Sequence, residues 1–145
     1  MIYWTLDCWV LANCNDCDCD EYFDSVSLLI KIKERDGICL DDLGEIYKEY
    51  AKHFLPRTFI SKWWKVISRS QGKIHSCSSH LPSRHRNKLN SMRFDSDDIK
   101  YVGTAFNSPD RKLVAGESDY STEVRDYLSN SCNIEVIHPS KCYDY

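Results

Sequence analysis

The chain has 145 residues, of which 42% are hydrophobic and 12% aromatic, and its formal net charge is −3. This apolar content excludes a disordered tail, and the length fits one hydrophobic core, so we expect residues 1–145 to form one domain. No apolar run approaches the roughly 18 residues that cross a bilayer, and the N-terminus lacks the basic region of a signal peptide. We therefore expect a cytoplasmic protein.

The first half of the chain predicts short strands that alternate with helices. Residues 2–6 are β-prone, and residues 21–35 place apolar side chains near one side of a helix. A short buried strand is expected at 37–40. A second helix is expected from the apolar spacing between residues 43 and 54, and Pro56 ends it.

The second half continues the alternation after a polar interval. A helix is expected at 58–69, a Ser-rich and His-rich loop at 71–84 and a short helix at 86–92. The remaining elements are expected to be a helix at 99–106, a strand at 112–116, a helix at 122–128 and a strand at 134–137. Strands that alternate with helices favour right-handed βαβ units, and hence an α/β fold with a mostly parallel sheet.

Eight cysteines are present, and without a sign of secretion we interpret them as reduced thiols. A zinc site is an alternative, and its candidate ligands are Cys14, Cys17, Cys19, His75, Cys77 and His80. The chain lacks two regular CxxC elements, and five acids crowd residues 16–24. Incidental thiols are therefore the favoured interpretation.

Charge is distributed unevenly along the chain. All 22 acidic residues lie in 1–52 or 95–145, whereas residues 53–94 contain none. The acid-free stretch can hold a polyanion while the flanking acids bind metal, or it can be a solvated basic helix pair that balances acidic neighbours. The candidate nucleic-acid contacts are Arg57, Lys62, Lys65, Arg84, His85, Arg86 and Lys88, with Trp63, Trp64 or exposed tyrosines available to stack on bases.

Acidic residues follow two of the expected strands. Asp7 comes directly after 2–6, and Glu117 and Asp119 come after 112–116. Ligands of open parallel sheets collect beyond the carboxyl ends of the strands, so these acids are candidates for one crevice. Clustered carboxylates suit Mg²⁺ or Mn²⁺, and they repel one another when no cation is bound.

Four motifs in the same order resemble those of PIN-domain nucleases. Residues 6–11 (LDCWVL) are similar to the opening LDTNVL-like motif, and residues 45–50 (EIYKEY) to an EILxEY-like run. Residues 95–106 begin with the Asp-x-x-Asp that precedes a helix, and residues 113–120 (LVAGESDY) are similar to a VTGDxDF-like strand and turn. The resemblance extends over nearly the whole chain and is strongest in its C-terminal half.

The resemblance implies a three-layer α/β/α fold and a metal-dependent ribonuclease. It also implies a set of catalytic residues, which would hold Mg²⁺ or Mn²⁺ directly or through water. These residues are Asp7, Glu49, Asp98, Glu117 and Asp119, with Glu45 able to substitute for Glu49. The direct metal ligands would be Asp7, Asp98, Glu117 and Asp119. The implied substrate is single-stranded RNA, and the implied partners are an antitoxin and a second copy of the chain.

Two departures from the family pattern support an alternative function. Cys8-Trp9 replaces Thr-Asn, which removes two small polar groups beside the first acid, and Glu117 stands where Asp is usual. These changes favour a catalytically impaired module that binds nucleic acid or protein. A phosphatase-like enzyme with Asp7 as nucleophile ranks last, because the DxD common in such enzymes is absent.

Overall fold

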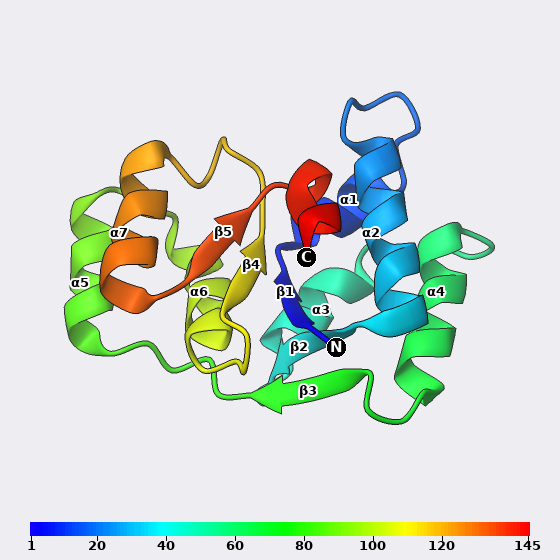
Figure 1. Cartoon of the computed structure of the whole chain (residues 1–145), viewed down its shortest axis with the longest axis horizontal. Helices are drawn as coiled ribbons and strands as arrows, with labels where there is room; N and C mark the ends of the chain where they lie inside the picture. The colour runs from blue at the N-terminus through cyan, green and yellow to red at the C-terminus, as the bar shows by residue number, and fades with distance from the viewer.

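The computed structural model describes residues 1–145 and has a central sheet of five strands (Figure 1). The strands lie in the order β3-β2-β1-β4-β5, and every neighbouring pair is parallel. They are β1 (Tyr3–Leu6), β2 (Gly37–Asp41), β3 (Ile74–Cys77), β4 (Lys112–Val114) and β5 (Glu135–Ile137). The predicted α/β class is confirmed, and the sheet is entirely parallel.

Helices cover both faces of the sheet and complete the predicted α/β/α layers. One face is covered by α6, which contacts β1, β2 and β4, while α2 packs with the C-terminal turn η2 in front of β1 (Figure 1). The α-helices are α1 (Cys8–Asn13), α2 (Tyr22–Arg35), α3 (Glu45–Ala51), α4 (Phe59–Arg69), α5 (Ser83–Ser91), α6 (Ile99–Phe106) and α7 (Thr122–Cys132). Two 3₁₀ turns are η1 (Ser96–Asp98) and η2 (Pro139–Asp144).

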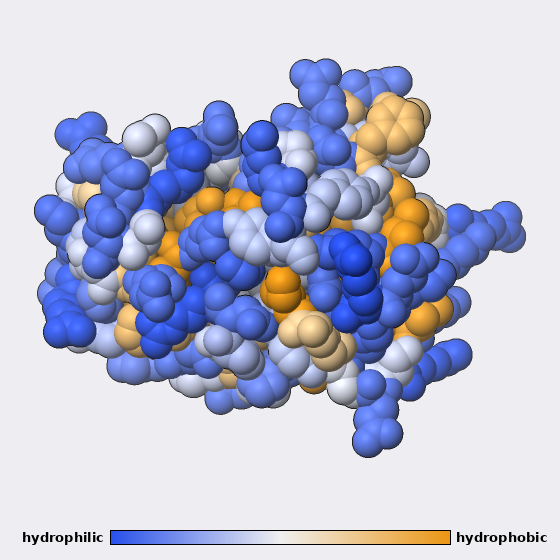
Figure 2. Space-filling model, viewed as in Figure 1, coloured by the Kyte–Doolittle hydropathy of each residue, from blue (hydrophilic) through white to orange (hydrophobic).

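The central strands are apolar because both of their faces are covered. Trp4, Leu6, Ile38 and Leu113 are fully buried, as is typical of strands in parallel sheets. The face of the molecule in Figure 2 is mostly hydrophilic, with apolar residues showing along the side where α2 lies and in narrower gaps elsewhere. One core thus serves the whole chain.

The segment 71–84, predicted as a loop, contains the edge strand β3. His75 and Ser76 are exposed, so the stretch lacks the apolar pattern of a buried strand. Its backbone pairs with β2, from Ile38 opposite Ile74 to the position of Cys77. These backbone hydrogen bonds do not depend on side-chain type, and the loop prediction was wrong for that reason.

Most other elements agree with their predicted positions and differ mainly at their ends, but helix α1 was not predicted. Helix α7 continues past Leu128 to Cys132, and Asn133 then ends it with a left-handed backbone at φ 53°. Helix α5 begins at Ser83, earlier than predicted, and the sequence did not predict η2. None of the helices is both long and apolar enough to cross a membrane.

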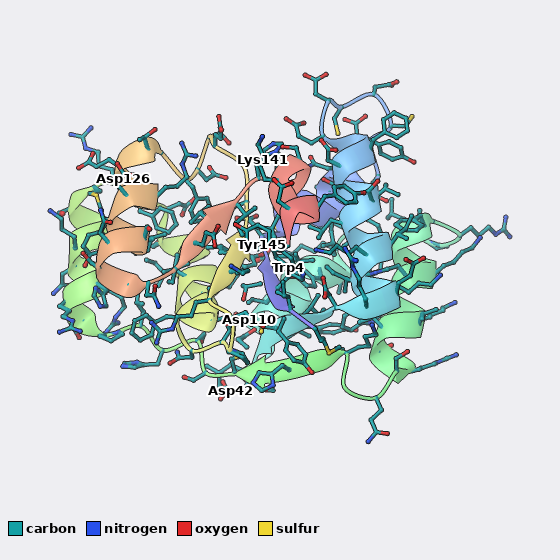
Figure 3. The ribbon with its side chains drawn as sticks, in the orientation of Figure 1. Trp4, Asp42, Asp110, Asp126, Lys141 and Tyr145 are labelled. Atoms are coloured by element: carbon teal, nitrogen blue, oxygen red, sulfur yellow. The ribbon has the colours of Figure 1, made fainter.

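A buried polar contact at the amino end of β1 joins α2 to the end of the chain. Asp36 accepts hydrogen bonds from the Trp4 indole at 3.0 Å and the Ile2 amide at 3.1 Å, and the Lys31 ammonium lies 3.4 Å away. Lys31 also donates to the Cys142 carbonyl of η2 at 2.7 Å. In front of this contact, Tyr145 packs edge-on against Trp4, 5.7 Å between ring centres (Figure 3).

Candidate active site at the carboxyl end of the sheet

Asp7 connects β1 to α1 at the edge of the sheet where the parallel strands end (Figure 1). Only 4% of its surface is exposed. Its backbone amide donates to the Val114 carbonyl of β4 at 3.0 Å, and one carboxylate oxygen accepts from the Trp9 amide at 2.9 Å. Asp7 therefore caps α1 with one oxygen, and the other oxygen takes no part in the cap.

Two further acids approach Asp7 from distant parts of the chain. Asp98 ends η1 directly before α6, and Asp119 lies in the turn from β4 to α7. Burial raises the pKa of Asp98 to about 7, and the negative charges of Asp7 and Asp119 contribute. Burial and the charge of Asp119 also raise the pKa of Asp7, against the Trp9 amide and Lys100. We call Asp7, Asp98 and Asp119 the carboxylate cluster.

Glu49 and Lys100 border the carboxylate cluster. The Lys100 ammonium lies 3.7 Å from the Glu49 carboxylate, and its charge lowers the pKa of Asp98. Cys8 lies between these groups: burial raises the pKa of its thiol, and the charges of Asp7, Glu49 and Asp98 raise it further. Three of the predicted acids, Asp7, Glu49 and Asp98, thus lie near one half-buried thiol.

Glu45 and Glu117 lie outside this arrangement. The Glu45 side chain is 52% exposed and lies 3.8 Å from Lys48, so Glu49 is the acid of α3 that borders the cluster. The Glu117 side chain is 73% exposed and lies 3.9 Å from Arg125. Glu117 lines a separate cavity of about 850 Å³ whose wall also includes Trp9 and His138.

Three buried tyrosines lie beneath the carboxylate cluster. The Tyr50 hydroxyl donates to the Leu6 carbonyl, just before Asp7. The Tyr101 hydroxyl has only the Cys8 thiol beside it, and the Tyr120 hydroxyl has no hydrogen-bond partner. A buried polar group without a partner costs about 1–3 kcal/mol, so these hydroxyls are not explained by folding alone.

Neither Lys100 nor Tyr120 was predicted as a site residue, although both adjoin candidate acids. Lys100 lies two residues after Asp98, and Tyr120 directly follows Asp119. The available signal was Tyr120 in the place of the Phe that ends the family motif. A hydroxyl added at a position expected to be buried is informative, because it needs a partner.

The predicted nucleic-acid contacts form two separate groups. Helices α4 and α5 lie at opposite ends of the molecule (Figure 1), so the acid-free stretch is not one surface. Arg57, Lys62 and Lys65 belong to the α4 end, and Arg84, Arg86 and Lys88 belong to α5. All six side chains are exposed.

Two side chains assigned to RNA contact are instead buried. His85 is 4% exposed, and its ring nitrogen lies 2.7 Å from the Tyr127 hydroxyl, so its prediction as a surface residue was wrong. It faces inward from α5 because Phe106 and Tyr127 pack against its ring. Trp63 is also buried and donates to the Leu29 carbonyl at 2.8 Å, so of the two tryptophans only the half-buried Trp64 is partly accessible for stacking.

All eight cysteines are free thiols. Burial raises the pKa of Cys14 to about 12, and its thiol hydrogen-bonds the Val10 carbonyl within its own helical turn. Cys17 is exposed, and no zinc-binding group is assembled around it. The Cys14 thiol therefore has a partner within its own helix.

The carboxylate cluster fits a divalent cation in kind and in charge. Its donors are oxygens, which Mg²⁺ and Mn²⁺ prefer, and a cation would offset the repulsion that raises the pKa of Asp98. The orphaned Tyr120 hydroxyl also indicates that a polar partner is absent. In the present conformation no three acidic, Cys or His side chains are close enough to hold one metal ion. Binding of a metal ion would therefore require the carboxylates to move closer together.

Comparison with known proteins places the chain among α/β folds of this kind. No protein-family model and no curated protein matches the sequence. One similar solved structure is VapBC2 from Rickettsia felis bound to a DNA fragment from their promoter, with a TM-score of 0.51 and 12% identity. The match covers 95% of this chain and 98% of that chain. This similarity shows the fold alone, and the five-stranded parallel sheet is consistent with a PIN-like fold.

Proposed function

We propose that the protein is a metal-dependent ribonuclease that cuts single-stranded RNA at the carboxylate cluster. The observation that carries the proposal is the approach of Asp7 and Asp119 to Asp98, where burial raises the pKa of Asp98 to about 7 and the two negative charges contribute. Asp7 is buried, Asp98 is half-buried and Asp119 is exposed, and groups whose pKa is shifted by burial and by nearby charge often gather at functional sites. Mg²⁺ or Mn²⁺ is the cation that such oxygen donors suit.

In this proposal each acid has a distinct position. Asp7, Asp98 and Asp119 hold the ion, Glu49 acts from the border of the cluster, and Glu117 contributes at most through water because it is exposed beside Arg125. A bound ion would supply an activated water and neutralise charge that grows on the phosphate. Lys100 remains within reach to balance the charge of Glu49.

The partners follow from the same proposal. Basic side chains on α4 and α5 would contact the RNA backbone, although one strand would have to cross the molecule to reach both ends. The structurally similar chain comes from VapBC2, captured with promoter DNA. We extend this to a toxin role for the present chain, with an antitoxin and a second copy as its protein partners.

The test is cleavage of labelled single-stranded RNA with Mn²⁺ or Mg²⁺. Wild type is expected to cut, EDTA to stop it, and Asp98→Asn to lower the rate by about 100-fold or more, because a ligand is lost. Glu45→Gln is the matched control, since this acid is solvent-exposed on α3 outside the cluster and its loss is expected to leave the rate unchanged. Cleavage that persists in EDTA and in Asp98→Asn would contradict the proposal.

A second candidate function is a binding module without catalysis. The observation that favours it is that no three ligand side chains stand at metal-binding distance, with Cys8 and Trp9 in place of small polar residues. This candidate predicts RNA binding that survives both EDTA and Asp98→Asn. Measuring RNA affinity with the same three samples separates the two functions.

A further inference from the structure

One cavity of about 850 Å³ shares two chain segments with the carboxylate cluster. Trp9 forms part of its wall, and the Trp9 amide donates to the Asp7 carboxylate at 2.9 Å. Residues 116–118 form another part of the wall, and the turn to which they belong continues to Asp119. A ligand in this cavity therefore lies beside residues that adjoin two acids of the cluster.

Trp9 is held in the cavity wall by its neighbours. Its ring lies against the backbone of Gly116, where an added Cβ would come within 3.1 Å of the indole. Gly116 does not have a positive φ, so the missing side chain serves to make room for the indole. The His138 ring lies tilted to it, 6.0 Å between ring centres. Trp9 is half-buried, so its ring is both fixed and partly accessible, and a ligand that stacks on it would immobilise little else.

Charges of both signs line the rest of the cavity. The cations are Arg125 of α7 and Lys141 of η2 (Figure 3), and the acids are Glu21, Glu117, Glu135 and Asp144. Glu117 lies 3.9 Å from Arg125, and Glu135 lies 2.8 Å from Lys112. This excess of acids disfavours a phosphate inside the cavity. A neutral planar ring with both donors and acceptors on its edge can pair with either sign of charge, and a nucleobase is such a ring.

We propose that Trp9 is a stacking platform for one base of single-stranded RNA, which enters this cavity while its phosphates stay outside. The inference takes the identity of the ligand from the proposed function, and it does not require a bound metal ion. Stacking of a base on an aromatic ring tolerates any sequence and strengthens binding by about 10-fold or more. Trp9 stands where the PIN-domain pattern has Asn, so this departure would add a base contact next to the acids.

The experiment measures the binding of two labelled tetranucleotides in EDTA, so that no metal ion contributes to the affinity. One is tetraadenylate, and the other has the same ribose-phosphate backbone without bases. Wild type is expected to bind tetraadenylate about 10-fold more tightly, and Trp9→Leu to bind the two equally. Trp9→Tyr keeps a ring and should keep most of this base preference. Trp64→Leu, the same exchange at another half-buried tryptophan on α4, is the matched control and should leave the base preference unchanged.

Three results would overturn the inference. They are equal binding of the two tetranucleotides by wild type, a base preference that Trp9→Leu retains, and an equal loss in Trp9→Leu and Trp9→Tyr with a lowered unfolding midpoint in both. The last result would assign Trp9 to packing alone. Cleavage of RNA by wild type with Mn²⁺ is measured separately. Cleavage without a base preference would remove only the role of the cavity, whereas a base preference without cleavage would keep the binding site and remove the nuclease.

Discussion

Asp36 lies at the amino end of β1 and Asp7 at its carboxyl end, and each is only 4% exposed. Asp36 receives hydrogen bonds from Trp4 and Ile2 and lies beside Lys31, so its pKa is lowered although burial alone would raise it. Asp7 has one backbone donor and faces other acids, and its pKa is raised by burial and by Asp119. The charged form of the aspartate is therefore stabilised at one end of the strand and destabilised at the other.

The difference separates a structural acid from a functional one. Around Asp36, every strong donor is supplied by the fold, and the contact ties α2 to η2. Around Asp7, the fold supplies further acids and an orphaned hydroxyl, and so it leaves charge for a ligand to offset. Burial alone does not distinguish the two sites; the balance of donors and acceptors does.

The largest expected effect is on stability at the Asp36 end. Asp36→Asn should lower the free energy of unfolding by about 3–5 kcal/mol, because it leaves the buried Lys31 ammonium without its counter-charge. Urea denaturation measures the change. The exposed Asp126→Asn is the control and should stay within about 0.5 kcal/mol of wild type. An equal change in both variants would remove the contrast.

At the Asp7 end the sign should reverse. Asp98→Asn removes a half-buried negative charge among like charges, so without added metal the free energy of unfolding should rise by about 0.5–2 kcal/mol. The same urea titration measures it. A loss of stability comparable to that of Asp36→Asn would show that Asp98 is paired in a way that the structure does not reveal.

The two ends should also respond oppositely to pH. The folded pKa of Asp98 is raised to about 7, so its charge destabilises the fold above that pH, and stability recovers as pH falls from 7 towards the unfolded value near 4. The pKa of Asp36 is lowered, so its contribution is present above about pH 4 and is lost as pH falls through the folded value. The stability gap between Asp98→Asn and wild type should therefore be wider at pH 8 than at pH 5, and an equal gap would contradict the assignment.

The smallest expected effect comes from Glu117. Its contact with Arg125 is exposed and contributes about 0–1 kcal/mol. Glu117→Gln should therefore change the free energy of unfolding by no more than about 1 kcal/mol and the rate of RNA cleavage by no more than about threefold. Rates measured beside Asp98→Asn provide the scale. A loss as large as that of Asp98→Asn would make Glu117 a direct ligand and extend the cluster beyond Asp119.

The order and type of nearly all elements could be predicted from the sequence, because α/β proteins repeat apolar strands and amphipathic helices. β3 could not, since Ile74 and Cys77 alone carry its apolar signal and backbone pairing holds it. The parallel arrangement follows from the alternation of strands and helices. Boundaries such as the end of α7 at Asn133 depend on backbone conformations that residue type specifies only weakly.

Prediction of the site was less complete. The positions of Asp7 and Asp119 follow from the strands that precede them, whereas the approach of Asp98 depends on how η1 and α6 pack. The outward direction of Glu117 and the burial of His85 are tertiary features that a sequence motif does not encode. Whether the predicted ligands Asp7, Asp98, Glu117 and Asp119 bind a metal ion stays a prediction.

The central claim is that the carboxylate cluster is unstable by itself and accepts a divalent cation. Thermal unfolding of wild type and Asp98→Asn at pH 7, each with and without Mn²⁺, tests it most directly. We expect Mn²⁺ to raise the unfolding midpoint of wild type and to leave that of Asp98→Asn unchanged. A wild-type midpoint that does not respond to Mn²⁺, together with an Asp98→Asn variant less stable than wild type, would contradict it.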